Sequence, residues 1–519
     1  MGFGRRVLLV WPPGWNLCVG GPHIALPTLK ASLDLAGTEC ELVDLNLALA
    51  DEFDLRISST DVLEACKTDT LESMNRPYFA VADRMAAIGG QWGGTWSVER
   101  GFHPSGFSPR SSALLRDSIA SESPLSTVAR KLLVPRLQNS DIRLVGISVA
   151  VADQLLPAFQ IAREARNAGF DGLIVLGGNV VSRLANELSQ DWVFDLFDAL
   201  VVFQGEQALQ SLGDNPHLAG LKTAPNIRWR NDGVIVSNPI QRSIGTCLPA
   251  FDGLPVGNYW GMNYLPILSA KGCYYGHCSF CDIPFGWSGG EYLGGFDPKQ
   301  VADAITALSV KYNMSRFKFV EEALAPSAAR AIFTALASKG YSGCFEAYAR
   351  LEDAWADTSL LKIASETGLR KLYLGLEVIP GTSRPALNKR DSASPLRLLA
   401  LLHDHGIKVH IFSMFGFPGT GVDEAFATID FLLKHASLVD TVDVGPYTFS
   451  KHTQVSGIDV VRRHHDDLAL DFEYRPTQSG GVSSEEAREL ASQLEAVVYS
   501  QHPKWIHPIY RMYSPWCRT

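Results

Sequence analysis

The sequence lacks the features that would place it in several large classes of protein. Only 9 of its 519 residues are cysteine, which is too few for a disulfide framework in a chain of this length. No apolar run approaches the roughly 20 residues needed to span a bilayer. The net charge of -9 argues against a nucleic-acid or anionic-membrane surface as the main partner. We therefore expect a cytoplasmic protein in a reducing compartment.

The N-terminus shows one pattern that could suggest export. Two arginines precede the apolar run at residues 7–11, but that run is too short for a signal peptide and Pro12-Pro13 end it. A buried first strand is the better interpretation.

The first part of the chain alternates near-continuous apolar strands with helical segments. This pattern predicts a parallel sheet covered on both faces, a Rossmann-like α/β domain over residues 1–225. Such sheets bind ligands beyond the carboxyl ends of their strands. The expected strands lie at residues 6–11, 40–45, 142–150, 171–176 and 197–203. Five residues at or near their ends are candidates for ligand binding: Ser148, Gly177, Gly178, Gly205 and Glu206.

A long segment at about residues 51–139 interrupts this domain. A loop of that length inside a compact domain is usually functional or mobile, so either a lid or a variable insertion fits. We expect helical pieces around residues 62–74 and 114–133. Residues 226–258 then read as a connector that begins with a hairpin around an Asp-Gly turn.

The second part, residues 259–450, repeats a strand and a helix. Six strands with helical crossovers are two short of a closed eight-stranded barrel, so we expect a partial (β/α)6 barrel with its chemistry at the carboxyl ends of the strands. The expected strands lie at residues 265–270, 317–320, 344–349, 371–376, 408–414 and 441–447. Residues 451–519 are expected to form a C-terminal helical region.

Three cysteines follow the first barrel strand within nine residues: Cys273, Cys278 and Cys281. Three thiolates on one glycine-bearing loop can hold three irons of a [4Fe–4S] cluster and leave the fourth iron open. The alternative is a structural zinc site with a distant fourth ligand. His277 is adjacent to Cys278 and is poorly placed to be that ligand.

Polar residues or glycine also follow the other barrel strands. Glu321 and Glu322 follow the second strand, Arg350 the third, Glu377 the fourth and Gly416 the fifth. The two adjacent glutamates could instead be a charge pair at a helix N-terminus. Arg350 and Glu377 could equally form a structural ion pair with each other.

These stretches together resemble a known family. The spacing Cys-x4-Cys-x2-Cys resembles the cluster-binding signature of radical S-adenosylmethionine (SAM) enzymes, although the usual first gap is three residues, and Phe280 fills the aromatic place before the last cysteine. Residues 317–326, 375–377 and 415–420 resemble further family stretches, and the N-terminal part looks like a cobalamin-binding domain. The chain thus resembles cobalamin-dependent radical SAM enzymes of the methyltransferase type.

The resemblance implies three cofactors, namely a [4Fe–4S] cluster, SAM and cobalamin. Cys273, Cys278 and Cys281 would carry the cluster, and Glu321 or Glu322 would contact the SAM ammonium group. Phe280, Arg350, Glu377 and Gly416 would complete the SAM site. The strand-end residues of the first domain, Ser148, Gly177, Gly178, Gly205 and Glu206, would bind cobalamin.

One departure concerns the lower face of cobalt. Cobalamin domains that ligate cobalt from below often carry Asp-x-His-x-x-Gly after the first strand, but here His23 lacks the preceding aspartate at the right spacing. We therefore predict no histidine ligand to cobalt, which would favour methyl transfer through cob(I)alamin.

The predicted function is methylation of an unactivated carbon of a small molecule, in specialised-metabolite or antibiotic biosynthesis. A reductant such as flavodoxin or ferredoxin would supply electrons, with no nucleic-acid or membrane partner. Cobalamin-dependent cyclisation or rearrangement without methyl transfer is the first alternative. A non-catalytic cobalamin-binding module is the second.

Overall fold

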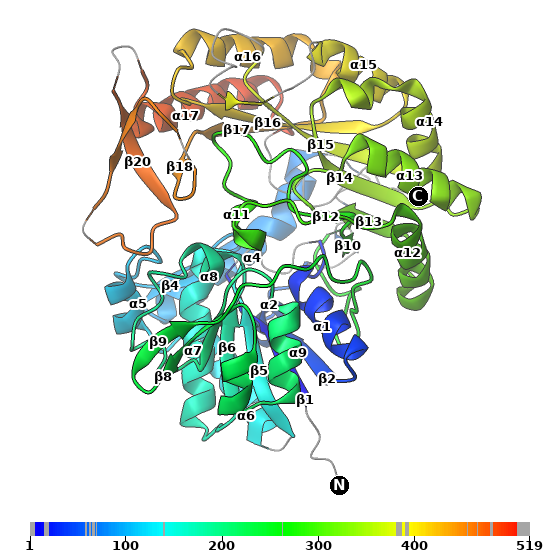
Figure 1. The fold of residues 1–519 in the computed structure, drawn as a ribbon. Coiled ribbons are helices and arrows are strands. Elements are labelled where there is room, and N and C mark those ends of the chain that lie inside the picture. The colour runs from blue at the N-terminus through cyan, green and yellow to red at the C-terminus, as the bar shows by residue number, and fades with distance from the viewer. Residues whose placement is uncertain are drawn as a thin grey trace. The chain divides into compact units, whose positions relative to one another are not determined.

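The computed structural model describes residues 6–14, 20–57, 60, 61, 64, 68, 70–138, 141–261, 263–379, 387–389, 394–453, 455–463, 465–477 and 481–505. The chain forms two compact units, each built from separate stretches of sequence (Figure 1). Unit 1 comprises Met1–Asn263, Phe285–Gly289 and His464–Leu470. Unit 2 comprises Tyr264–Pro284, Gly290–Arg463 and Asp471–Thr519.

Unit 1 is built on a seven-stranded sheet in the order β2-β1-β5-β6-β7-β8-β9. The first five strands are parallel, as the sequence predicts, and the Asp-Gly hairpin β8–β9 extends the same sheet in antiparallel pairing. The strands are β1 Arg6–Trp11, β2 Glu39–Asp44, β5 Ile142–Ser148, β6 Leu173–Gly177, β7 Ala199–Val201, β8 Ile227–Asn231 and β9 Val234–Ser237. The helices are α1 Ala25–Leu35, α2 Leu45–Glu52, α7 Leu155–Asn167, α8 Asn179–Arg183, α9 Glu206–Asp214, α10 Leu218–Thr223 and α11 Phe285–Ser288.

The segment at residues 51–139 is more ordered than its sequence suggests. It contains a small antiparallel hairpin, β3 Gly94–Ser97 with β4 Gly101–Pro104, which packs on a long helix. The predicted helix at residues 114–133 is two helices, because Pro124 starts a new one. The predicted helix at residues 62–74 lies largely outside the described residues. The helices of the segment are α4 Leu71–Gln91, α5 Ser112–Ser118 and α6 Pro124–Gln138.

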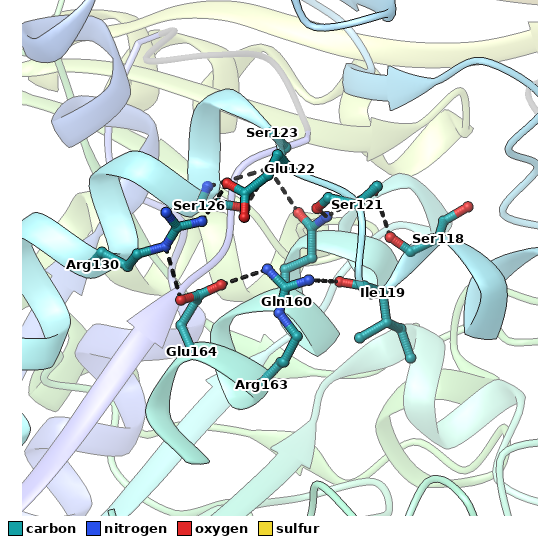
Figure 2. A network of polar contacts seen from close by, with 10 residues as sticks. All are labelled: Ser118, Ile119, Ser121, Glu122, Ser123, Ser126, Arg130, Gln160, Arg163 and Glu164. Atoms are coloured by element: carbon teal, nitrogen blue, oxygen red, sulfur yellow. Dashed lines mark hydrogen bonds and ion pairs between the residues drawn. The ribbon is translucent and has the colours of Figure 1, made fainter. Parts of the chain in front are cut away.

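A polar network bonds this segment to the core helix α7 (Figure 2). The hydroxyl of Ser123 donates to Oε1 of Gln160 over 2.9 Å, and Nε2 of Gln160 donates to the carbonyl of Ser121 over 3.0 Å. Nε of Arg130 donates to Oε2 of the buried Glu164 over 3.0 Å. The α5–α6 part of the segment is therefore bonded to the core of the domain, and it is not a detached lid.

Unit 2 is built on six parallel strands in sequence order, β10-β13-β14-β15-β16-β17. β10 and β17 are its two edges, so the sheet is an open partial barrel, and the predicted fold class is confirmed. The strands are β10 Leu265–Ile267, β13 Arg316–Phe319, β14 Cys344–Arg350, β15 Leu369–Glu377, β16 Lys408–Phe415 and β17 Thr441–Pro446. The crossover helices are α12 Pro298–Tyr312, α13 Pro326–Ser338, α14 Thr358–Thr367, α15 Pro395–Asp404 and α16 Val422–Lys434.

Local sequence signals explain where these helices begin. α12, α13 and α15 each have proline in the first turn, where its missing N–H costs nothing. The side chains of Asp297 and Asp357 accept hydrogen bonds from backbone N–H groups and cap α12 and α14. Because all six strands are parallel, each crossover returns the chain to the same end of the sheet.

Two regions of unit 2 differ from the sequence predictions. The expected first strand ends early, because β11 Ala270–Lys271 leaves the sheet and pairs with β12 Gly294–Gly295. The C-terminal region is not purely helical: β18 Phe449–Ser450, β19 Ile458–Val461 and β20 Asp471–Pro476 form a small sheet before α17 Ser484–Gln501. Among the described residues, no helix is both long and apolar enough to cross a bilayer.

Candidate functional site

The cysteine loop begins where β11 ends. Gly272 and Gly276 adopt φ angles of +84° and +64°, which turn the loop tightly, and the N–H of Cys281 donates to the carbonyl of Cys278 over 3.2 Å. Burial raises the pKa of Cys278 to about 11 and that of Cys281 to about 12. The neighbouring thiols, including Cys273, raise the pKa of Cys281 further, so the three sulfur atoms are within electrostatic reach of one another.

The donor chemistry of this loop suits a soft iron centre. All three thiols are free and half-buried, and thiolates are the ligands of iron–sulfur clusters. His277 is exposed and its ring packs edge-on against Tyr275 at 5.3 Å. Among the described residues, no three histidine, cysteine or acidic side chains are already gathered as a metal site. The thiols would therefore have to draw together when they bind a cluster.

A short segment after β15 grips the cysteine loop through three hydrogen bonds. The N–H of Ser279 donates to the carbonyl of Leu387 over 3.1 Å, and the Tyr275 hydroxyl donates to the carbonyl of Asn388 over 2.6 Å. In return, Nδ2 of Asn388 donates to the carbonyl of His277 over 2.8 Å. Sequence reasoning missed this segment, because nothing in residues 387–389 resembles a binding motif.

Arg350, at the end of β14, also contacts the loop. Its guanidinium carbon lies 3.6 Å from the ring centre of Tyr275, and its Nη1 donates to Glu352 over 3.2 Å. The Tyr274 hydroxyl donates to the same glutamate. Arg350 is buried and forms its ion pair with Glu352, so the alternative of a pair with Glu377 is not what the structure shows.

Glu377, at the end of β15, pairs with Lys389 instead. The Lys389 ammonium also donates to the carbonyl of Gly375 over 2.7 Å, and the side chains of Glu377 and Lys389 are only 10% and 5% exposed. Glu377 adopts φ of +55°, an uncommon conformation for a residue other than glycine. Lys389 lowers the pKa of Cys278 against the rise from burial, so this cation is close to the cysteine loop.

Among the described residues of unit 2, Glu321 is the most deeply buried acid. It is 1% exposed, its Oε1 accepts a hydrogen bond from the Ser269 hydroxyl, and its Oε2 is buried with no hydrogen-bond partner among the described residues. Burial raises its pKa to about 7. Glu322 is only half-buried. A buried carboxylate oxygen without a hydrogen-bond donor is a fitting place for an ammonium group.

Phe280 and Gly416 have packing partners that account for them. The Phe280 ring lies edge-on to Phe417 at 6.3 Å. Gly416 adopts φ of +83°, and a Cβ there would lie 2.5 Å from the Cβ of Ala487 in α17. Its carbonyl accepts a hydrogen bond from the Tyr474 hydroxyl over 2.7 Å. Close packing of α17 therefore explains the glycine without a ligand.

The second candidate site is the carboxyl edge of the sheet in unit 1. Ser148 and Gly177 end adjacent strands and are paired in register. Gly178 adopts φ of +109°, and a Cβ there would lie 2.3 Å from the carbonyl oxygen of Val149. Gly205 precedes α9, whose first turn contains the buried Glu206. The five predicted residues thus lie at the ends of β5, β6 and β7, where a parallel sheet binds ligands.

His23 also lies beyond the end of β1. Its ring stacks on Trp11 with centres 4.2 Å apart, and its Nδ1 accepts a hydrogen bond from the N–H of Ala25 over 3.3 Å. Burial lowers its pKa to about 4, so the ring is neutral at pH 7. Nδ1 is thus engaged by the backbone of α1 in this structure.

Comparison with solved structures shows which fold this is. The chain is similar to the radical SAM methyltransferase TsrM from Kitasatospora setae with cobalamin and a [4Fe–4S] cluster bound, at 16% identity and a TM-score of 0.54 over 94% of this chain and 81% of that one. It is also similar to the cobalamin-dependent SAM radical enzyme OxsB with aqua-cobalamin and SAM bound, at 13% identity and a TM-score of 0.61 over 95% of this chain and 66% of that one.

Sequence comparison adds nothing to this likeness. No protein-family model and no curated protein sequence matches the chain. At such low identity the structural likeness shows the fold alone. The chain has the fold of cobalamin-dependent radical SAM enzymes, as its motifs predict.

Proposed function

We propose that this chain, which has the fold of cobalamin-dependent radical SAM enzymes, methylates an unactivated carbon of a small molecule. The observation that carries the proposal is the surroundings of the cysteine loop. Three free thiols share one tight loop, and the charged groups Lys389, Arg350 and Glu377 act on the pKa of Cys278. Such a constellation serves an open cofactor site better than a closed structural one.

In unit 2, Cys273, Cys278 and Cys281 would hold the [4Fe–4S] cluster. The unpartnered Oε2 of Glu321 would accept the SAM ammonium group, and the cations Arg350 and Lys389 are candidates for its carboxylate. Glu377 would contact the ribose while Lys389 balances its charge. Phe280 and Gly416 would shape the walls of this site through their packing partners.

In unit 1, the carboxyl edge of the sheet would hold cobalamin. β5 ends in serine and β6 in glycine, which leave more room beyond the strands than larger residues would, and the N-terminus of α9 has backbone N–H groups beside Glu206. The residues we assign to this site are those predicted from the sequence: Ser148, Gly177, Gly178, Gly205 and Glu206.

When bound, these groups would supply an electron, a radical source and a methyl carrier, chemistry that protein side chains lack. The contribution of the chain is to bind and orient them. The buried ion pair of Glu377 with Lys389 is fixed before the ligands arrive, so little reorganisation is needed when charge develops. A reductant such as flavodoxin or ferredoxin would serve the cluster, in a cytoplasmic pathway of specialised-metabolite or antibiotic biosynthesis.

The test uses SAM with a deuterated methyl group and the reconstituted, reduced protein. Candidate substrates from an extract are incubated with it, and products are compared by mass. A product three mass units heavier with the labelled SAM than with unlabelled SAM supports methyl transfer. Products formed without label would contradict it.

The same fold occurs in TsrM, a methyltransferase, and in OxsB, a cobalamin-dependent SAM radical enzyme, and one fold can serve several reactions, so we keep two further candidates. Cyclisation or rearrangement would give an unlabelled product together with 5′-deoxyadenosine. A non-catalytic cobalamin-binding module would give cobalamin binding without any 5′-deoxyadenosine.

A further inference from the structure

The hairpin β3–β4 lies at the topological switch point of unit 1. From β1 the chain adds β2 on one side of the sheet, and from β5 it adds β6 and β7 on the other side, so the order of strands reverses between β1 and β5. Open α/β sheets bind their ligands in the crevice at that point. Gly14 follows β1, and a Cβ there would lie 3.0 Å from the carbonyl oxygen of Asp153 and 3.4 Å from that of Arg100. A Cβ on Gly101 would lie 2.7 Å from the Cα of Gly14. The loop after β1 therefore meets both the hairpin and the loop after β5 backbone to backbone.

The loops that follow β1 and β5 are joined to each other as well. The buried Gln154 donates from Nε2 to the carbonyl of Pro12 over 2.6 Å, and its Oε1 accepts from the N–H of Ala150 over 2.8 Å. The helix that begins at the next residue, α7, is the one that the network of Figure 2 bonds to α5 and α6. The hairpin thus belongs to a segment that contacts the loop after β1 and is also hydrogen-bonded to α7.

One side chain of the hairpin brings a nitrogen donor to this place. His103, in β4, has its buried Nε2 3.1 Å from Oδ1 of Asp153, within ion-pair distance although off the line of a hydrogen bond. Its ring lies edge-on to Phe107 at 5.0 Å, and its Nδ1 makes no hydrogen bond with any described residue. Histidines that bind metals commonly have one ring nitrogen beside a carboxylate, which orients the other toward the metal.

We propose that His103, oriented by Asp153, is the nitrogen ligand on the lower face of cobalt when cobalamin occupies unit 1. This inference rests on the proposed function. It revises the prediction of no histidine ligand, which considered only the loop after the first strand. Here the aspartate and the histidine come from different segments, 50 residues apart and in the reverse order, so no local motif could show the pair.

The test is electron paramagnetic resonance of the full-length protein loaded with cob(II)alamin. The protein is labelled with ¹⁵N in histidine only, so that the benzimidazole nitrogen of cobalamin stays ¹⁴N. Ligation by a protein histidine splits each cobalt line into a doublet from ¹⁵N in place of the ¹⁴N triplet. A triplet that survives labelling, or the absence of any nitrogen splitting, overturns the proposal.

Three variants assign the doublet. His103→Ala should abolish it, and Asp153→Ala should reduce the histidine-ligated fraction about tenfold or more. His23→Gln is the matched control and should retain it; loss in this control alone would overturn the assignment to His103. Even if a variant misfolds, the labelled wild-type protein decides whether any histidine of the chain ligates cobalt, and no doublet there overturns the proposal. A chain that binds no cob(II)alamin on gel filtration contradicts the proposed function, whereas binding without a histidine doublet contradicts this inference alone.

Discussion

At the residue scale, the chemistry proposed for unit 2 depends on ionisable side chains that are shielded from water. Glu321, Glu377 and Lys389 are nearly fully buried, and each lies at or after the end of a barrel strand. The protonation state of each of these side chains depends on how deeply it is buried and on its neighbours, and the sequence alone does not show which residues those neighbours are. Ser269 beside Glu321 and Lys389 beside Glu377 are examples.

Cys278→Ala should remove one of three cluster thiolates. We expect the reconstituted protein to lose its cluster absorbance and to form no 5′-deoxyadenosine above the cluster-free background. Cys247→Ser alters a cysteine outside the loop and is the control; iron content and SAM cleavage should stay as in the wild type. Normal cleavage by Cys278→Ala would contradict the assignment of the loop.

Glu321→Gln should change how stability depends on pH. Burial raises the pKa of this acid from 4.5 to about 7, so the folded chain holds a proton that the unfolded chain releases between these values. This contribution to the free energy of unfolding is full below pH 4.5 and falls by about 3 kcal/mol as the pH rises to 7. The variant stays neutral and should lack that decline.

Urea denaturation at several pH values measures this slope. Glu489→Gln replaces an exposed glutamate of α17 and should keep the wild-type slope. Identical slopes in the wild type and Glu321→Gln would show that Glu321 is not the buried acid described.

At the scale of elements, the sequence predicted almost every strand of both sheets. Strands such as β5 and β15 have near-continuous apolar runs, and proline or aspartate marks the helix starts, so local signals suffice. The hairpin β3–β4 and the sheet β18–β20 were missed because most of their strands have only two to four residues, too few for an apolar pattern to show. The segment 387–389 was missed because its bonds to the cysteine loop join residues more than 100 positions apart.

Gly416→Ala tests the packing of α17 on the barrel. The added methyl group would meet Ala487, and φ of +83° is strained for alanine, so we expect a loss of about 2–4 kcal/mol in the free energy of unfolding. Gly406 has a similar φ of +69°, but a Cβ there would meet nothing within 4 Å. Gly406→Ala should therefore lower the free energy of unfolding by only about 1 kcal/mol. Equal losses in urea denaturation would argue against tight packing at Gly416.

At the scale of the whole molecule, the two units are interleaved in sequence. Residues 464–470 belong to unit 1, although they follow all six barrel strands of unit 2. Oδ1 of Asp467 accepts a hydrogen bond from the N–H of Ser112 over 2.9 Å, and Nε of Arg110 donates to Asp466 over 3.2 Å. A late segment of the chain therefore supports the start of α5.

Asp467→Ala should destabilise α5, although the two residues that bond here, Ser112 and Asp467, are 355 positions apart in the chain. Loss of the acceptor at the first turn should cost about 1 kcal/mol and speed amide exchange in α5 while the barrel strands stay protected. Asp459→Ala, an exposed aspartate of β19, is the control and should leave α5 unchanged. Unchanged exchange in α5 of the Asp467 variant would contradict this support.

The interleaving also sets the order in which the protein can be completed during synthesis. A chain that has left the ribosome only as far as β17 has every strand of both sheets, yet unit 1 still lacks residues 464–470. β1 must itself wait for β5, more than 130 residues later, before the centre of its sheet can pair. Domains usually fold as separate units with the N-terminal one first. Here the N-terminal unit cannot be finished before the barrel has been made, so a truncated chain would leave both units exposed to misfolding at once.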